Sequence, residues 1–217
     1  MMRFENVKFK YPTNSDFELI IDNFEPKGCT AILGENASGK TTLGKLAAGI
    51  LRPSSGAVYY HGEDIAGWKL GKIGRHVGYL FQEPSRQIFA PKPLEEIALP
   101  LELRGMPKEE ARELALALLQ EFELENIVNS TTFTLSRGEK QRLAIAAAMV
   151  MKPRFFVLDE PTTGLDKPRR QILAKTLKKM QADGMEILII SHDRDFVEIM
   201  GADIRRMEGG RLLDEKA

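Results

Sequence analysis

A glycine-rich stretch in the first quarter of the chain has the residue types and the spacing of a phosphate-binding loop. It follows the pattern GxxxxGK[ST] and consists of Gly34, Glu35, Asn36, Ala37, Ser38, Gly39, Lys40 and Thr41. Glycines let such a loop curve so that successive backbone N–H groups point at phosphate oxygens. Lys40 is expected to reach the β- and γ-phosphates, and the Thr41 hydroxyl to ligate Mg²⁺. The stretch therefore predicts a site for the phosphates of a nucleotide.

A pair of acidic residues further along the chain has the position of a second part of this site. Asp159 and Glu160 directly follow the apolar run 155–158, which is typical of a buried strand. Ligands of open parallel sheets lie at the carboxyl ends of strands. Asp159 is therefore expected to hold Mg²⁺, directly or through water, and Glu160 to polarise an attacking water. The alternative is a strand end that carries two solvated acids.

The elements that must position these residues alternate in type. The apolar run 29–33 predicts a buried strand before the loop, and a helix is expected over 41–51 after it. The later part of the chain predicts strands over 155–158 and 186–190, and helices over 168–182 and 193–200. This alternation indicates an α/β fold with a parallel sheet as its core.

Other segments are expected to surround this core. The alternating stretches 3–9 and 17–24, with 57–60, predict an N-terminal antiparallel β-subdomain, and 204–214 predicts a hairpin. An inserted helical subdomain is expected over about 84–151. One of its helices is expected to begin at Pro107, with an apolar face formed by Leu114, Leu118, Leu119 and Phe122. Another is expected to run from Ser136 to about Met151. Residues 1–217 are expected to form a single domain.

The composition narrows the class of protein. Lys and Arg together number 31, as do Asp and Glu, so the formal net charge is zero. A protein whose main task is to grip nucleic acid usually carries a basic excess, and no nucleic-acid partner is expected. Apolar runs are far shorter than the roughly 20 residues of a spanning helix, so membrane contact is expected through a partner. The single cysteine, Cys29, fits a reducing compartment.

Five further motifs give the chain a resemblance to a known family. Residues 135–142, Leu-Ser-Arg-Gly-Glu-Lys-Gln-Arg, resemble the LSGGQ signature and following Gln-Arg pair of the nucleotide-binding subunits of ABC transporters. Gln82 matches the Q-loop of this family, residues 161–166 match its D-loop, and His192 matches its switch histidine. Tyr11 stands where the family stacks an aromatic ring on adenine. The resemblance covers nearly all 217 residues and implies a P-loop NTPase fold of the ABC type.

The resemblance implies an ATPase that binds ATP and Mg²⁺. In the family, two such domains pair head to tail around two ATP molecules. Ser136 and Gly138 of one chain would then contact the γ-phosphate that is bound by Lys40 of the other chain, a favourable place for an anion because it is a helix N-terminus. The resemblance further implies that the whole loop and Thr42 bind the nucleotide. Catalysis would fall to Lys40, to His192 and to Glu160 as general base. Gln82 would ligate Mg²⁺ together with Thr41 and Asp159, and Asp166 would contact the opposite loop.

The sequence departs from the family pattern in the signature. Arg137 replaces the first glycine and Glu139 replaces the glutamine. Ser136 and Gly138 are retained, so ATP binding is expected to survive, whereas Arg137 either helps a phosphate or clashes with the partner. The aromatic position is also open: Phe9 lies on the same strand face as Tyr11, which is favoured because Pro12 ends the strand there.

A segment after Gln82 resembles a subgroup, the energy-coupling factor ATPases, which include the cobalt-uptake group. The resemblance rests on residues 81–90 and 94–98, although Ser85-Arg86 and Lys92-Pro93 depart from the usual version. It implies an ATPase that powers import of a vitamin or metal ion from the cytoplasmic face of a prokaryotic membrane. Its partners would be a second ABC ATPase subunit, identical or similar, a transmembrane scaffold that docks between Gln82 and Leu103, and a substrate-binding membrane subunit.

Two other functions compete with this one. A soluble ABC ATPase that acts on ribosomes or DNA usually has two cassettes in one chain or a long coiled-coil insertion, and neither is visible in the sequence. An ABC exporter ATPase is the third possibility. Members of the importer subgroup commonly carry a C-terminal extension beyond the last motif; without one, dimerisation is expected to depend more on ATP or on the membrane partner. The transported substrate does not follow from the sequence.

Overall fold

Parallel strands form the centre of the structure, a computed structural model that describes residues 1–12 and 14–213. Four of them lie in the order β3 (Cys29–Leu33), β8 (Glu186–Ile190), β7 (Phe155–Asp159) and β6 (Val77–Leu80). A further strand, β9 (Asp203–Glu208), runs parallel to β3 on its other side. All residues of β3 and β7 are buried, as expected for strands that are covered on both faces.

The sheet continues into an antiparallel part that contains the N-terminal strands. β10 (Arg211–Leu213) pairs antiparallel with β9 and parallel with β2 (Asn14–Phe24). Beyond β2 lie β1 (Met2–Tyr11), β4 (Ser55–Tyr60) and β5 (Glu63–Asp64), each antiparallel to its neighbour. Within the described residues, the strand pairing therefore connects the antiparallel and the parallel parts in one sheet of ten strands.

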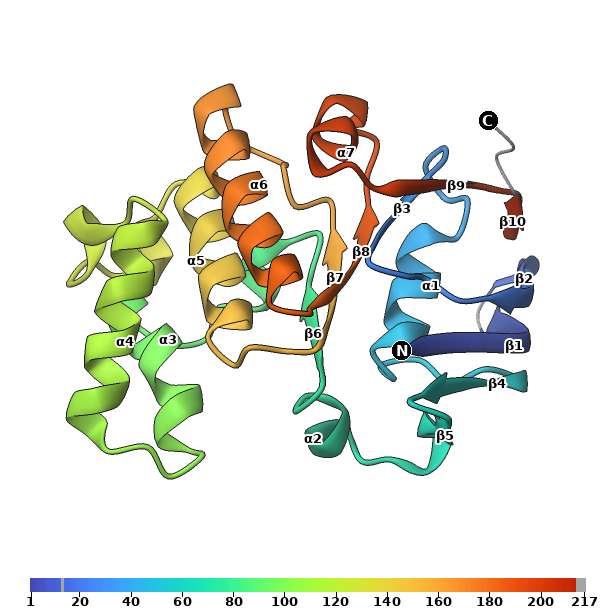
Figure 1. The fold of residues 1–217 in the computed structure, drawn as a ribbon, viewed down its shortest axis with the longest axis horizontal. Helices are drawn as coiled ribbons and strands as arrows, with labels where there is room; N and C mark the ends of the chain where they lie inside the picture. Colours follow the sequence, from blue (N-terminus) through green and yellow to red (C-terminus); the bar gives the residue numbers. More distant parts are fainter. Residues whose placement is uncertain (13, 214–217) are drawn as a thin grey trace.

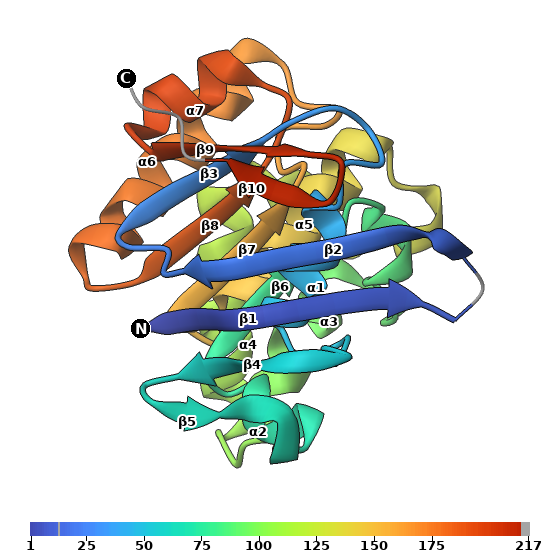
Figure 2. The ribbon, with the colours of Figure 1, turned by 90° about the vertical axis from the view of Figure 1, so that its right-hand side faces the viewer.

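Helix α1 (Lys40–Ala47) lies between these two parts (Figure 1). Its apolar residues Leu43 and Leu46 belong to one buried cluster with Phe4 of β1 on one side and Val157 and Ile190 of the parallel strands on the other. Figure 2 shows β1, β2 and β4 side by side in front of α1. The helix that follows the phosphate-loop sequence is therefore fixed from both sides.

Most of the remaining helices lie on the opposite side of the parallel strands from α1 (Figure 1). Three of them connect β6 to β7, namely α3 (Pro93–Glu102), α4 (Lys108–Glu121) and α5 (Arg137–Met149). The other two are α6 (Lys167–Ala182), between β7 and β8, and α7 (Arg194–Met200), between β8 and β9. A short helix α2 (Leu70–Ile73) and four 3₁₀ turns complete the described elements: η1 (Ile65–Gly67), η2 (Pro84–Arg86), η3 (Glu125–Ile127) and η4 (Thr132–Thr134).

Alternation along β7 decides where its acidic end points. Phe156 and Leu158 pack in the cluster beneath the helices α3–α7, whereas Phe155 and Val157 pack in the cluster around α1. Because side chains alternate between the faces of a strand, Asp159 points to the side of α1. The carboxylate therefore lies on the same face as the loop that precedes α1.

The expected strands and helices are present, with two corrections. The helix expected over 41–51 ends at Ala47, because Gly49 has a φ of +62° and turns the chain back on the helix. Leu114 of α4 does not belong to the buried face of that helix: it is exposed, while Leu119 and Phe122 are buried with Ala111 and Ala115. The hairpin expected over 204–214 is β9–β10, although Asp214 lies outside the described residues. Among those residues, no helix has the length and apolar character that crossing a bilayer requires.

Candidate nucleotide site

The loop between β3 and α1 has a backbone that only glycine accommodates at two positions. A side chain at Gly34 would place its Cβ 2.1 Å from the backbone oxygen of Met207 in β9. Gly39, the residue before α1, has a φ of 109° in the left-handed region. The turn between β9 and β10 braces the loop, since the Gly210 N–H donates to the Ser38 oxygen at 3.0 Å. The loop is therefore curved tightly and held against the C-terminal hairpin.

Lys40 lies inside this curve. Its ammonium donates to the backbone oxygens of Gly34 at 2.8 Å and Glu35 at 2.6 Å, and to the Ser38 hydroxyl at 3.5 Å. The side chain is 7% exposed. Burial lowers the pKa of Lys40, and the nearby carboxylates of Glu160 and Asp159 oppose that shift. The charge thus sits where the loop, the strand end and the helix N-terminus meet.

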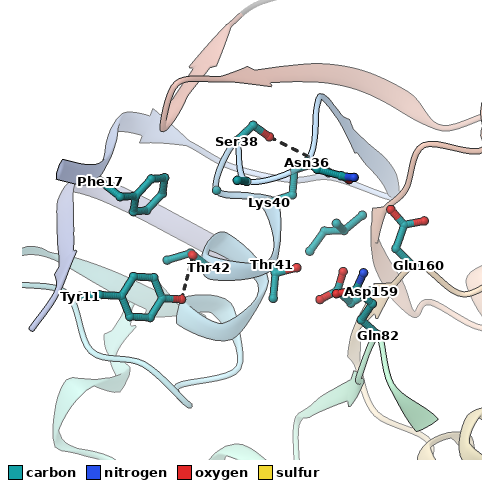
Figure 3. Close-up of a pocket in the computed structure, with 13 residues that line it drawn as sticks. Tyr11, Phe17, Asn36, Ser38, Lys40, Thr41, Thr42, Gln82, Asp159 and Glu160 are labelled. Atoms are coloured by element: carbon teal, nitrogen blue, oxygen red, sulfur yellow. Dashed lines mark hydrogen bonds between the residues drawn. The ribbon is translucent and has the colours of Figure 1, made fainter. Parts of the chain in front are cut away.

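A cavity of about 410 Å³ opens beside the loop (Figure 3). Eleven residues expected to bind nucleotide or Mg²⁺ or to act in catalysis line it: Tyr11, Asn36, Ala37, Ser38, Gly39, Lys40, Thr41, Thr42, Gln82, Asp159 and Glu160. Two more lining residues, Phe17 and Ile190, were not expected from the sequence. Gly34 and Glu35 are not among the lining residues and contribute through their contacts with Lys40. The structure therefore brings the loop, Gln82 and both acids to one cavity.

Aromatic side chains form one end of the cavity. Tyr11 and Phe17 both line it, with ring centroids 6.2 Å apart, and the Tyr11 hydroxyl lies 3.0 Å from the Thr42 hydroxyl. Phe9, the competitor of Tyr11, is buried in the core and packs edge-on against Tyr11. The signal for Phe17 was that it is an aromatic residue at the start of the predicted strand 17–24.

Oxygen-bearing side chains gather at the other end, where Figure 3 shows Thr41, Gln82 and Asp159 close together. Asp159 is 1% exposed, and its Oδ2 accepts from the Tyr79 hydroxyl at 3.1 Å. Its other oxygen, Oδ1, has no hydrogen-bond partner among the described residues. Burial raises the pKa of Asp159, although the Thr41 and Tyr79 hydroxyls oppose this. A carboxylate with an unpartnered oxygen beside a hydroxyl and an amide fits the oxygen ligands that Mg²⁺ takes.

Glu160 stands next to the cavity in an unusual backbone conformation. Its φ is 53°, in the left-handed region, and its side chain is almost fully buried. The carboxylate Oε2 lies 2.8 Å from Nδ1 of His192 and accepts from the Ser191 hydroxyl at 3.3 Å. The His192 side chain is 75% exposed and does not line the cavity. The carboxylate is thus oriented by two groups that follow β8.

The remaining expected residues lie away from this cavity. Ser136 caps the N-terminus of α5, and Gly138 lies in the first turn of that helix. Gly138 is close to Gly164: a Cβ added at Gly138 would lie 3.0 Å from the backbone oxygen of Gly164. Asp166 caps α6 and forms an ion pair with Arg169. None of the three lines the cavity. The structure therefore brings the signature and the D-loop together with each other, but not with the phosphate loop of the same chain.

Comparisons with known proteins agree with this geometry. The model of the ABC transporter family matches residues 21–163. A relative from Mycoplasma mobile, energy-coupling factor transporter ATP-binding protein EcfA1, is 35% identical over 90% of the chain and 72% of its own length. The solved structure of cbiO1 from Clostridium perfringens, part of the ABC transporter complex cbiONQ, is 32% identical with a TM-score of 0.82, covering 98% of this chain and 86% of its own.

A second solved structure is similar over the whole chain. The ATP-binding cassette MJ0796, a dimer in a post-hydrolysis state bound to ADP and Pi, is 27% identical with a TM-score of 0.89, and the match covers 100% of this chain and 98% of that one. A curated relative from Methanosarcina acetivorans, a putative ABC transporter ATP-binding protein, is 37% identical over 84% of this chain. The match spans only 30% of that relative, so the chain corresponds to about a third of its length.

Proposed function

Because this chain belongs to the ABC transporter family and is an ATP-binding ATPase, we propose that it powers a membrane importer of the energy-coupling factor type. The single observation that carries the proposal is the distribution of the motifs. One cavity holds the loop, Gln82 and the acidic pair, while the signature residues Ser136 and Gly138 stand on a separate surface of the same chain. A second chain would complete each site.

Binding of ATP follows from the two ends of the cavity. The loop residues 34–39 and Lys40 hold the phosphates with backbone N–H groups, an ammonium and a helix N-terminus. Thr42 supports Tyr11 through its hydroxyl, and Tyr11 and Phe17 receive the adenine at the aromatic end. An aromatic ring contributes about 1–3 kcal/mol by stacking on a base.

A magnesium ion fits the other end. Thr41, Asp159 and Gln82 would hold it, and it would neutralise charge that develops on the phosphates. Gln82 is exposed and lies just beyond the end of β6, so its side chain can approach or leave the cavity without disturbing the core. Asp159 is fixed by burial and by Tyr79.

Hydrolysis is assigned to Glu160 and His192, together with Lys40. Glu160 accepts a proton from the attacking water as general base, because its carboxylate faces the cavity beside the loop. His192 hydrogen-bonds to that carboxylate and, being exposed, is free to contact the γ-phosphate and the water. Lys40 stabilises the negative charge of the transferred phosphoryl group.

Two chains would close around two ATP molecules. Ser136 and Gly138 of one chain then contact the γ-phosphate that is held by Lys40 of the other, and Asp166 contacts the opposite loop. The second ATPase subunit is an identical or a similar chain. Dimeric MJ0796 with ADP and Pi supports this arrangement, since it resembles this chain over its whole length.

The surface beside α3 supports a role in transport. A hollow of about 390 Å³ is lined by Phe89, Leu94, Leu99 and neighbouring residues, in the segment after Gln82. Phe89 and Phe133 are 65% and 81% exposed there, and the two segments are joined because Thr132 donates to the Ala90 oxygen at 2.7 Å. A transmembrane scaffold docks on this surface, placing the chain at the cytoplasmic face of the membrane as a peripheral subunit.

The wider assembly follows the same reasoning. A separate membrane subunit binds the transported vitamin or metal ion, and the ATPase touches only the scaffold. Residues 1–217 act as one ABC ATPase domain, in which residues 84–151 form a helical subdomain that moves relative to the core. ATP binding brings two chains together, and hydrolysis releases them.

Sedimentation of the Glu160→Gln variant with and without Mg-ATP tests the proposal. Without its general base, the chain should retain ATP, and a monomer should become a dimer only when Mg-ATP is present. The double variant Glu160→Gln/Ser136→Ala is the matched control and should dimerise less. The proposed ATP-bound dimer would be overturned if the variant binds ATP but no two ATPase chains associate, either in the isolated chain or in a complex copurified with its membrane subunits.

A further inference from the structure

Gln141 connects the signature helix α5 to the backbone of Glu160, the proposed general base. It lies on α5, five residues after Ser136, and its side chain is fully buried at 0% exposure. Its Nε2 donates to the backbone oxygens of Glu160 at 3.3 Å and of Pro161 at 3.1 Å. A side chain of the helical segment therefore binds the peptide group that follows β7.

The peptide that Gln141 binds is held in a strained conformation. A non-glycine residue in the left-handed region is unfavourable and persists only where the surroundings fix it. Glu160 has a φ of 53°; its N–H donates to the Ile190 oxygen at 2.8 Å, and its oxygen also accepts from the Thr163 N–H at 3.3 Å. The amide of Gln141 completes this set of bonds from the opposite side of the chain.

Packing alone does not account for an amide at this position. Oε1 of Gln141 is buried and has no hydrogen-bond partner among the described residues. An unpartnered buried oxygen is unfavourable, so if this position only had to be filled, an apolar side chain of similar volume would be the better occupant. The two N–H donors of the amide are what such a side chain would lack.

We propose that Gln141 is a positioning residue that sets the direction of the Glu160 carboxylate and couples it to the signature helix. Ser136 caps the same helix, so a shift of α5 when Ser136 engages a γ-phosphate is transmitted through Gln141 to the peptide 160–161. Each chain thereby orients its own general base, Glu160, in response to the ATP held by its partner. This coupling rests on the proposed sandwich and on the proposed role of Glu160.

Steady-state and single-turnover hydrolysis by Gln141→Met and Gln141→Leu test the inference. Both variants keep the volume and lose the donors. The turnover number should fall by about tenfold or more because a misdirected base loses its alignment. The KM for ATP and the nucleotide affinity should stay within about twofold. The thermal midpoint should change little, because the variants remove the unpartnered Oε1 but also take one donor from the Pro161 oxygen. Met149→Leu, a buried change at the other end of α5, is the matched control.

A double-variant comparison separates positioning from a structural role. If Gln141 acts through the Glu160 carboxylate, Gln141→Met should not lower the residual single-turnover rate any further in the Glu160→Gln background. An unchanged turnover number, a fall that follows a loss of thermal stability, or an additive effect in the Glu160→Gln background would each overturn the inference. ATP-dependent dimerisation of Glu160→Gln/Gln141→Met is measured in parallel: if Glu160→Gln itself never dimerises, the proposed function fails instead.

Discussion

The carboxylate of Glu139 accepts both the backbone N–H of Ser136, at 2.8 Å, and its hydroxyl, at 2.7 Å. In return the Ser136 oxygen accepts from the Glu139 N–H at 3.3 Å, which completes a capping box at the start of α5. These bonds lower the pKa of Glu139, so the carboxylate is charged at neutral pH. The Ser136 hydroxyl, which we propose to contact the γ-phosphate held by a partner chain, thus already donates to the Glu139 carboxylate of its own chain.

Glu139→Gln should therefore strengthen the ATP-dependent dimer. A glutamine keeps the capping box, removes a negative charge beside the proposed position of the partner's γ-phosphate and offers the Ser136 hydroxyl a weaker, neutral acceptor. Two charges about 4 Å apart repel by about 1 kcal/mol in water, which predicts a roughly fivefold lower ATP concentration at half-dimerisation. The measurement is sedimentation of the Glu160→Gln background over an ATP titration.

The control for this effect is Glu125→Gln, an exposed acid in the same helical segment. It changes the net charge equally but lies outside the capping box. Equal responses of the two variants would show that the net charge matters rather than the Ser136–Glu139 contact.

Lys40→Ala should weaken both nucleotide binding and the fold. The variant takes away the partner of the Gly34 and Glu35 oxygens, and a buried acceptor left without a partner costs about 1–3 kcal/mol. Titration with a fluorescent ATP analogue should show at least about a tenfold loss of affinity, because one charge-assisted contact contributes about 1.5–3 kcal/mol. Lys8→Ala, an exposed change on β1, should alter neither quantity. Normal affinity in Lys40→Ala would remove the lysine from the site.

Tyr11→Ala and Phe9→Ala should separate the two aromatic candidates. Tyr11 lines the cavity, so its loss should lower the affinity for ATP by about 1–3 kcal/mol with little change in thermal midpoint. Phe9 is buried in the core, so its loss should lower the free energy of unfolding by about 3–5 kcal/mol. A reversal of these two patterns would assign the adenine contact to Phe9.

Asp159→Asn should make the chain more stable at neutral pH while it abolishes Mg²⁺-dependent hydrolysis. Burial raises the pKa of this carboxyl above its ordinary value of 3.8. A raised pKa means that the protonated carboxyl favours the folded state, and that this contribution is lost as the pH rises through the folded-state pKa. The wild-type chain should therefore melt below the variant at pH 7.

Thermal melts without nucleotide or Mg²⁺ measure this difference as a function of pH. The gap should narrow as the pH falls through the raised folded-state pKa and should be smallest near 3.8, the ordinary value of the carboxyl. Each kcal/mol corresponds to about 2–4 °C for a chain of this size. Asp22→Asn, an exposed change on β2, is the control. A gap that does not depend on pH would mean that the burial of Asp159 has no electrostatic cost.

The sequence predicted those parts of the site that depend on local pattern. Three features are each recognisable from a few neighbouring residues: the run Cys29–Leu33, the glycines after it and the acidic end of β7. The alternation of Phe155 and Val157 with Phe156 and Leu158 then places Asp159 on the side of α1. Local spacing was therefore sufficient for the centre of the cavity.

Features that depend on distant contacts were not predictable in this way. Tyr79 reaches Asp159 across 80 positions of sequence, and Gln141 reaches Glu160 across 19, in both cases because neighbouring elements pack side by side. The apolar face of α4 was misjudged at Leu114 because the small residues Ala111 and Ala115 face the core, which apolar spacing alone does not distinguish. The C-terminal end of α1 depends on the backbone of Gly49 rather than on the apolar residues beyond it.

The position of β3 has a consequence for how the protein is made. Its two neighbours, β8 and β9, are translated more than 150 residues after it, and the Ser38 oxygen receives its bond from Gly210. A nascent chain that has left the ribosome only as far as α6 therefore contains the whole GxxxxGK[ST] sequence but neither strand that flanks it. Such long-range pairing is slow to form. Nucleotide retention by ribosome-bound chains of increasing length would thus show at which chain length the strands around β3 have paired.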